Sequence, residues 1–188
     1  EKEYSSVNLI VAHLGSGITI GLHHNGKVID VNNGLDGEGP FSPERSGSLP
    51  VGDLLKYFFN NNLTYEQGYK MICGQGGLVA YFGTNNFAEI IQKYEKGVNK
   101  KINLIVDAMA YQISKYISSM SAPVCGLVDG IVLTGGLSHF KIFIDLIIPK
   151  INFLTKNIFI YPGEDELMAM VEGILLSIEK KIKVLKYK

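Results

Sequence analysis

Residues 7–31, VNLIVAHLGSGITIGLHHNGKVIDV, decide the fold of this 188-residue chain. Three short runs rich in β-branched and apolar residues, 7–12, 18–23 and 27–31, are each typical of a strand. Gly15-Ser16-Gly17 separates the first two runs, and an Asn25-Gly26 pair separates the last two. Since Asn-Gly readily forms a two-residue hairpin turn, the segment predicts a three-stranded antiparallel meander.

The rest of the chain alternates helical and strand patterns. Residues 32–50 contain seven Gly or Pro residues and predict a long loop, a feature that is usually functional or disordered. Helices are expected over 51–60, 86–96, 99–120, 140–150 and 164–180, with Asn86 as the cap of the second of these. Another helix is expected from a Thr64/Gln67 capping box to the glycines at 73–77. Strands are expected over 129–134 and 157–161. This order predicts one α/β domain with a mixed sheet, in which the meander is followed by parallel strands.

The composition excludes several classes of protein. Lys and Arg number 18, Asp and Glu number 18, and 46% of the residues are hydrophobic. A neutral, apolar-rich chain is an ordinary globular domain and argues against binding to nucleic acid or an acidic membrane.

Two cysteines cannot make a disulfide-dense scaffold, so a reducing compartment, the cytoplasm, is expected. No apolar run approaches the roughly 20 residues of a membrane span. The absence of an initiating Met leads us to expect a piece of a longer polypeptide.

Two glycine-containing turns are candidate phosphate-binding sites. At residues 13–19, HLGSGIT, Gly15 and Gly17 would let backbone amides approach an anion and Ser16 could add a hydroxyl. At residues 134–138, TGGLS, the glycine pair follows a buried strand and precedes a helix, where helix amides can meet an anion. A plain hairpin turn and close packing of strand against helix, respectively, are equally good interpretations.

An acidic junction and a single arginine complete the set of candidates. The acids of PGEDE, residues 162–166, can cap the helix that follows or hold Mg²⁺, and the sequence does not separate the two. Arg45, the one Arg among 17 Lys, lies in the loop DGEGPFSPERSG, residues 36–47, where it can pair with Glu44 or reach a phosphate with its bidentate guanidinium. Since all four segments follow predicted strands, together they predict a cleft for a nucleotide and Mg²⁺.

In this order, NLIVAHLGSGITIG, VIDVNNGLDGEGPFSPERSGSLPVGDL, GQGGLVAYFGTN, DGIVLTGG and YPGEDELMAMVEG resemble the acetokinase family over nearly the whole chain. The DGEGPFSPERSG stretch resembles the kinases of butyrate and branched-chain carboxylates more than acetate kinases. The resemblance implies an actin-like (ribonuclease H-like) fold with helices on both faces of the sheet. It also implies that residues 1–188 are the C-terminal nucleotide-binding domain of a two-domain kinase whose N-terminal domain is absent here.

The resemblance also assigns roles to the candidate residues. It implies transfer of the γ-phosphate of ATP to a short-chain carboxylate, giving ADP and an acyl phosphate, with Mg²⁺ and in a homodimer. It places the second phosphate loop at His13, Gly15, Ser16 and Gly17, the phosphoryl clamp at Arg45, the adenosine turn at Thr134, Gly135, Gly136 and Leu137, and the Mg²⁺-associated acid at Asp165 or Glu166. An acetate or propionate kinase and a non-catalytic nucleotide-binding or dimerisation module remain alternatives, and the chain by itself is expected to be inactive. In this family an acid and a base usually follow the GGLVAY motif, whereas here residues 83–87 read GTNNF, so a charged nucleotide contact is not expected there.

Overall fold

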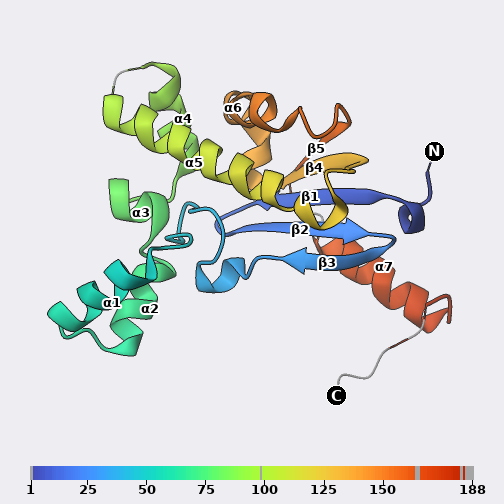
Figure 1. Ribbon diagram of the computed structural model, residues 1–188, viewed down its shortest axis with the longest axis horizontal. Coiled ribbons are helices and arrows are strands. Elements are labelled where there is room, and N and C mark those ends of the chain that lie inside the picture. Colours follow the sequence, from blue (N-terminus) through green and yellow to red (C-terminus); the bar gives the residue numbers. More distant parts are fainter. Residues whose placement is uncertain (1, 98, 164–165, 183, 185–188) are drawn as a thin grey trace.

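A five-stranded mixed sheet forms the centre of the chain (Figure 1). The computed structural model describes residues 2–97, 99–163, 166–182 and 184. The strands are β1 (Asn8–Leu14), β2 (Ile18–His24), β3 (Lys27–Val31), β4 (Gly130–Gly135) and β5 (Ile158–Pro162), in the order β3-β2-β1-β4-β5. The predicted meander is confirmed, because β1, β2 and β3 pair antiparallel and Asn25 and Gly26 both have positive φ. β4 pairs parallel with both β1 and β5, so the carboxyl ends of these three strands lie at one edge.

The helices begin and end close to the residues that the sequence predicts. They are α1 (Val51–Asn60), α2 (Tyr65–Ile72), α3 (Gly77–Phe82), α4 (Phe87–Glu95), α5 (Lys100–Ser119), α6 (Lys141–Ile151) and α7 (Glu166–Ile178). The capping box of Thr64 and Gln67 is present, and the Asn86 side chain caps α4. The short helix α3 does not appear in the sequence prediction, which ends the preceding helix at residues 73–77 without a new one.

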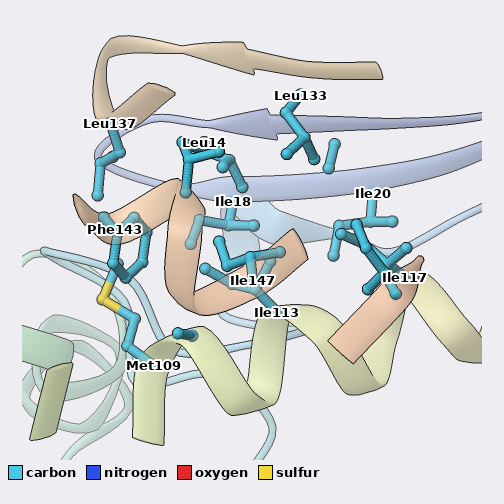
Figure 2. Close-up of a cluster of buried hydrophobic side chains, with 14 of the residues drawn as sticks. Leu14, Ile18, Ile20, Met109, Ile113, Ile117, Leu133, Leu137, Phe143 and Ile147 are labelled. Carbon is cyan, nitrogen blue, oxygen red and sulfur yellow. The ribbon is translucent and has the colours of Figure 1, made fainter. Parts of the chain in front are cut away.

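The core lies between the sheet and a layer made by α4, α5 and α6 (Figures 1 and 2). Its central side chains come from β1, β2, α5 and α6: Leu14, Ile18, Ile20, Met109, Ile113, Ile117, Phe143 and Ile147, all almost fully buried. The ring of Phe87, the first residue of α4, packs edge-on against Phe140 and Phe143, with ring centroids 5.3 and 4.9 Å away. This aromatic cluster fixes the start of α4 beside the start of α6.

The buried side chain of Asn32 connects the start of the loop over residues 32–50 to the sheet. Asn32 accepts a hydrogen bond from Ile20 N (2.7 Å) and donates to Ile18 O (3.0 Å) and Glu38 O (2.8 Å). These bonds satisfy backbone groups at the start of β2, in the part of that strand that pairs with β1 but not with β3. The loop that carries Arg45 is therefore fixed relative to the turn between β1 and β2.

Two helices expose most of their apolar side chains. α1 buries none of its residues, and on α7 Leu167, Met168, Met170, Val171, Ile174 and Ile178 are all exposed. α7 lies apart from the α4–α6 layer (Figure 1). Within the described part of the chain, no helix combines the length and the apolarity needed to cross a membrane.

Candidate active site

A cavity of about 320 Å³ opens at the carboxyl edge of the parallel strands. Its walls come from four segments far apart in sequence, and the lining residues are Gly15, Ser16, Pro43, Asn85, Asn86, Phe87, Ala88, Gly136, Leu137 and Phe140. The cavity brings together both predicted glycine turns and the loop that carries Arg45. Among the described residues that line it, none is charged.

The turn after β1 is folded onto itself. The Gly15 N–H donates to Gly17 O at 3.1 Å, so this amide is occupied within the turn. A Cβ at Gly15 would lie 3.0 Å from His13 Nε2, whereas a Cβ at Gly17 would meet only Gly34 O at an ordinary 3.6 Å. Gly15 thus leaves room for the His13 imidazole. The Gly15 amide is occupied within the turn, and the role of this turn in binding an anion stays a prediction.

His13 lies at the end of β1, in register with Thr19 on β2 and with Thr134 on β4. Its side chain is half-buried. The register places the imidazole at the strand edge where both candidate turns begin. His13 is not among the residues that line the cavity, so its proposed hydrogen bond to a phosphate stays a prediction.

The two glycines after β4 serve different purposes. Gly135 has φ +90°, and a Cβ there would lie 2.6 Å from Leu14 O, so the strand packs here against the backbone of β1. A Cβ at Gly136 would meet no atom within 4 Å, and Gly136 lines the cavity. Of the two alternatives that the sequence left open, close packing therefore applies to Gly135, whereas ligand approach at Gly136 stays a prediction.

The rest of this turn is anchored in the core. A short 3-10 helix, Gly136–His139, lies between β4 and α6. The Ser138 hydroxyl donates to Thr134 O at 2.8 Å, and the Leu137 side chain points into the apolar cluster (Figure 2). Leu137 therefore holds the turn in place chiefly through its buried side chain. The turn presents its Gly136 backbone to the cavity.

Arg45 is mostly buried and only partly paired. Its side chain is 19% exposed, and Nη1 lies 3.4 Å from Oε2 of Glu44, so the predicted local pair does form. That contact is long for a charge-assisted hydrogen bond. The buried Nε has no hydrogen-bond acceptor among the described residues. Buried donors are rarely left unpaired, so this Nε is unusual, but Arg45 itself does not line the cavity and its contact with a ligand stays a prediction.

The predicted metal site falls largely outside the described residues. Asp165 is not described, and of Glu166 only its place as the first residue of α7 is known. The described residues contain no group of three or more His, Cys, Asp or Glu that could hold a metal ion. Gly163, just before the junction, exchanges backbone hydrogen bonds with Gly135 at 3.1 and 3.3 Å. The chain thus enters the acidic junction directly beside the turn after β4.

The start of α4 and Phe140 form further walls of the cavity, and the segment over residues 83–87 contributes Asn85, Asn86 and Phe87 but no charged side chain. Asn85 Nδ2 donates to Glu44 Oε1 at 2.5 Å, which connects this wall to the loop of Arg45. Asn86 Oδ1 accepts from Glu89 N at 3.2 Å as the cap of α4. The capping signal of Asn86 was visible in the sequence. Nothing in the sequence places Phe140 across from it, because that contact depends on how α4 packs against α6.

Known proteins resemble this chain in sequence and in fold. The sequence model of the acetokinase family matches residues 1–155. The chain is 46% identical to butyrate kinase 2 of Clostridium acetobutylicum over all of its 188 residues, which cover 52% of that protein. Acetate kinase of Porphyromonas gingivalis superposes with a TM-score of 0.81 at 22% identity, over 93% of this chain and 50% of its own. A propionate kinase of Francisella tularensis gives a TM-score of 0.75 at 26% identity, over 86% of this chain and 47% of its own. These structural likenesses confirm the predicted actin-like fold, and the chain spans about half the length of the relatives it matches.

Proposed function

Because the chain belongs to the acetokinase family, we propose that it is the C-terminal, nucleotide-binding domain of a two-domain carboxylate kinase. The complete protein would transfer the γ-phosphate of ATP to a short-chain fatty acid, reversibly giving an acyl phosphate and ADP. The identity to a butyrate kinase supports butyrate or a branched-chain acid as the acceptor. The domain that would complete the carboxylate pocket corresponds to the half of the relatives that this chain does not cover.

The observation that carries the proposal is the convergence of separate motifs on one cavity. The turns at Ser16 and Gly136 lie 120 residues apart in sequence, yet both line the same 320 Å³ space together with Pro43 of the arginine loop. Each motif alone fits a purely structural role. Separate structural roles do not explain why these segments converge on one space.

The described residues fit a bound nucleotide. We assign the adenosine side to the neutral wall that Phe87, Phe140 and Gly136 share, where a flat ring can approach an aromatic edge and a bare backbone. The phosphates would lie at the turn of Ser16, towards Arg45. When bound, Mg²⁺ would neutralise phosphate charge, and Asp165 or Glu166 at the neighbouring junction would hold it through carboxylate and water.

The proposed chemistry needs positioning and positive charge more than covalent catalysis. The transition state of phosphoryl transfer spreads negative charge over the equatorial oxygens. Arg45 would stabilise that charge through its planar guanidinium, and His13 would donate a hydrogen bond to the transferring group. With the carboxylate as an in-line acceptor, no nucleophilic side chain of this chain is required.

The test is the activity of Arg45 variants of the complete protein in a hydroxamate-coupled assay. Arg45→Ala should lower kcat by about 10³- to 10⁵-fold, as loss of a charge-stabilising arginine does elsewhere, without loss of folding. Lys181→Ala, which removes an exposed cation paired with Glu179, is the matched control and should leave activity unchanged. Near wild-type turnover by Arg45→Ala would refute the assignment.

Two other functions make different predictions in the same assay. An acetate or propionate kinase would turn over the shorter acids faster than butyrate and isobutyrate. A non-catalytic nucleotide-binding or dimerisation module would bind ATP by calorimetry and form no acyl phosphate with any acid, even as the complete protein.

The apolar side chains that α1 and α7 expose suit further contacts. We propose that they are covered by the other domain and by a second copy in a homodimer. The proposed homodimer is tested by light scattering of the complete protein, which measures its assembly state directly.

Both cysteines, Cys73 and Cys125, are free thiols, and this supports the cytoplasm as the compartment.

A further inference from the structure

Ser42 is a fully buried polar residue between the two parts of the proposed phosphate site. Its exposed fraction is 0%. The hydroxyl donates to Ser16 O at 2.5 Å and accepts from Arg45 N at 3.0 Å and from Glu44 N at 3.3 Å. One side-chain oxygen therefore connects the turn after β1 with the backbone of the arginine loop.

The position of Ser42 is itself fixed by the backbone. Ser42 N donates to Arg45 O at 3.0 Å, which closes the turn that carries the guanidinium. Ser42 O accepts from Leu78 N of α3 at 3.1 Å, and Gly77 lies so close to this carbonyl that it has no room for a side chain. The hydroxyl thus projects from a rigid turn that α3 supports from the other side.

A second contact between the same segments depends less on this hydroxyl. Glu44 N also donates to Ser16 O, at 3.2 Å. Without the Ser42 hydroxyl this longer bond would remain, but Arg45 N would lose the one acceptor that the structure shows for it. Removal of the hydroxyl should therefore loosen the arginine loop relative to the phosphate turn without detaching it.

We propose that Ser42 is a positioning residue that holds Arg45 at a fixed separation from the phosphate-binding turn. The inference rests on the proposed kinase function, since it assigns Arg45 and Ser16 to one transferring phosphate. A catalytic group displaced by about 1 Å can lose about 10²-fold in rate while substrate still binds. Ser42 acts through Arg45 and does not itself touch the substrate.

The first test compares buried serines in the complete protein. Ser42→Ala should lower kcat by about 10- to 100-fold and change the KM for ATP by less than about threefold. Ser114→Ala is the matched control, because Ser114 is also buried and donates only to Ala110 O within α5, at 2.7 Å. Its kcat should equal that of the wild type. Ser42→Cys, which keeps the side-chain shape with only weak hydrogen bonding, covers the case in which Ser42→Ala does not fold.

The second test asks whether Ser42 works through Arg45. In an Arg45→Ala background, adding Ser42→Ala should reduce the residual kcat by less than about threefold, because residues that act as a unit are non-additive. General damage to the fold would instead multiply the loss equally in both backgrounds. That result, or a Ser42→Ala enzyme with the kcat of the Ser114→Ala control, overturns this inference alone. A wild-type protein without kinase activity overturns the proposed function and this inference together.

Discussion

The glycine pair after β4 allows packing and ligand binding to be separated by two adjacent substitutions. Gly135→Ala would place a Cβ 2.6 to 2.8 Å from backbone atoms of Leu14, at φ +90° and ψ 172°. This backbone region is essentially restricted to glycine and costs about 1–3 kcal/mol for other residues. Gly136→Ala would meet no atom within 4 Å and has an ordinary φ.

The expected effects are therefore opposite. For Gly135→Ala, the conformational cost and the contact with the β1 backbone together should lower the free energy of unfolding by about 3 kcal/mol or more. Gly136→Ala should leave it unchanged or raise it by about 0.4–1 kcal/mol, because alanine restricts the unfolded chain. In the cavity the new methyl group occupies space assigned to the nucleotide, so the Kd for ATP should rise by about tenfold or more, or roughly 1.4 kcal/mol.

The two measurements are urea unfolding and calorimetric titration with ATP and ADP, both on the complete protein. The result that refutes the reasoning is a Gly136→Ala protein with wild-type nucleotide affinity. The cavity would then not hold the nucleotide. A Gly135→Ala protein as stable as the wild type would contradict the assignment of Gly135 to packing.

Two further predictions concern residues outside the cavity. Hydrogen bonding to Lys2 (2.6 Å) and to Asn8 N holds the pKa of the Asp129 carboxyl below its usual range. This group therefore stabilises the fold at pH values above its ordinary pKa, and the stabilisation is lost as the pH falls through the lower pKa of the folded state. Lys2→Ala should shift the Asp129 pKa back up in an NMR titration, and an unchanged pKa would contradict the pair. Burial, followed by the hydrogen bond to Asp107, raises the pKa of Tyr94 to about 12, so its contribution is present below pH 10 and is lost as the pH rises towards 12. Tyr94→Phe should therefore show a shallower loss of stability in alkali, measured by unfolding at pH 9 to 12, and equal slopes for the two proteins would contradict this.

Local signals account for the parts of the fold that the sequence predicts well. The Asn25-Gly26 turn and the capping box at Thr64 each depend on residues a few positions apart, and both are present. The helix α3 is different, since it has six residues and begins at Gly77 with φ +58°. Its start is set by contacts with the arginine loop, which no local pattern contains.

The candidate site shows the same division between local and tertiary information. Both glycine turns and Arg45 are recognisable from residue type and from their place after strands. The roles within each turn are not, because Gly135 and Gly136 are the same residue type and only the neighbouring β1 backbone distinguishes them. Ser42 gives no signal in the sequence, where it is one serine in a loop of glycines and prolines. Its importance arises from complete burial and three hydrogen bonds.

The proposed role of Arg45 as the phosphoryl clamp is one that no described residue lining the cavity can take over by charge. The chain carries 18 basic residues, yet none of the described residues that line the cavity is among them. Pro43 of the same loop lines the cavity whereas Arg45 does not, and the buried Arg45 Nε has no acceptor among the described residues. Lysine at this position would keep the charge but lose the planar fork that can contact two phosphate oxygens together. Compared with the wild type, Arg45→Lys should therefore keep nucleotide binding better than turnover. An Arg45→Lys enzyme with the full kcat would show that positive charge alone is sufficient.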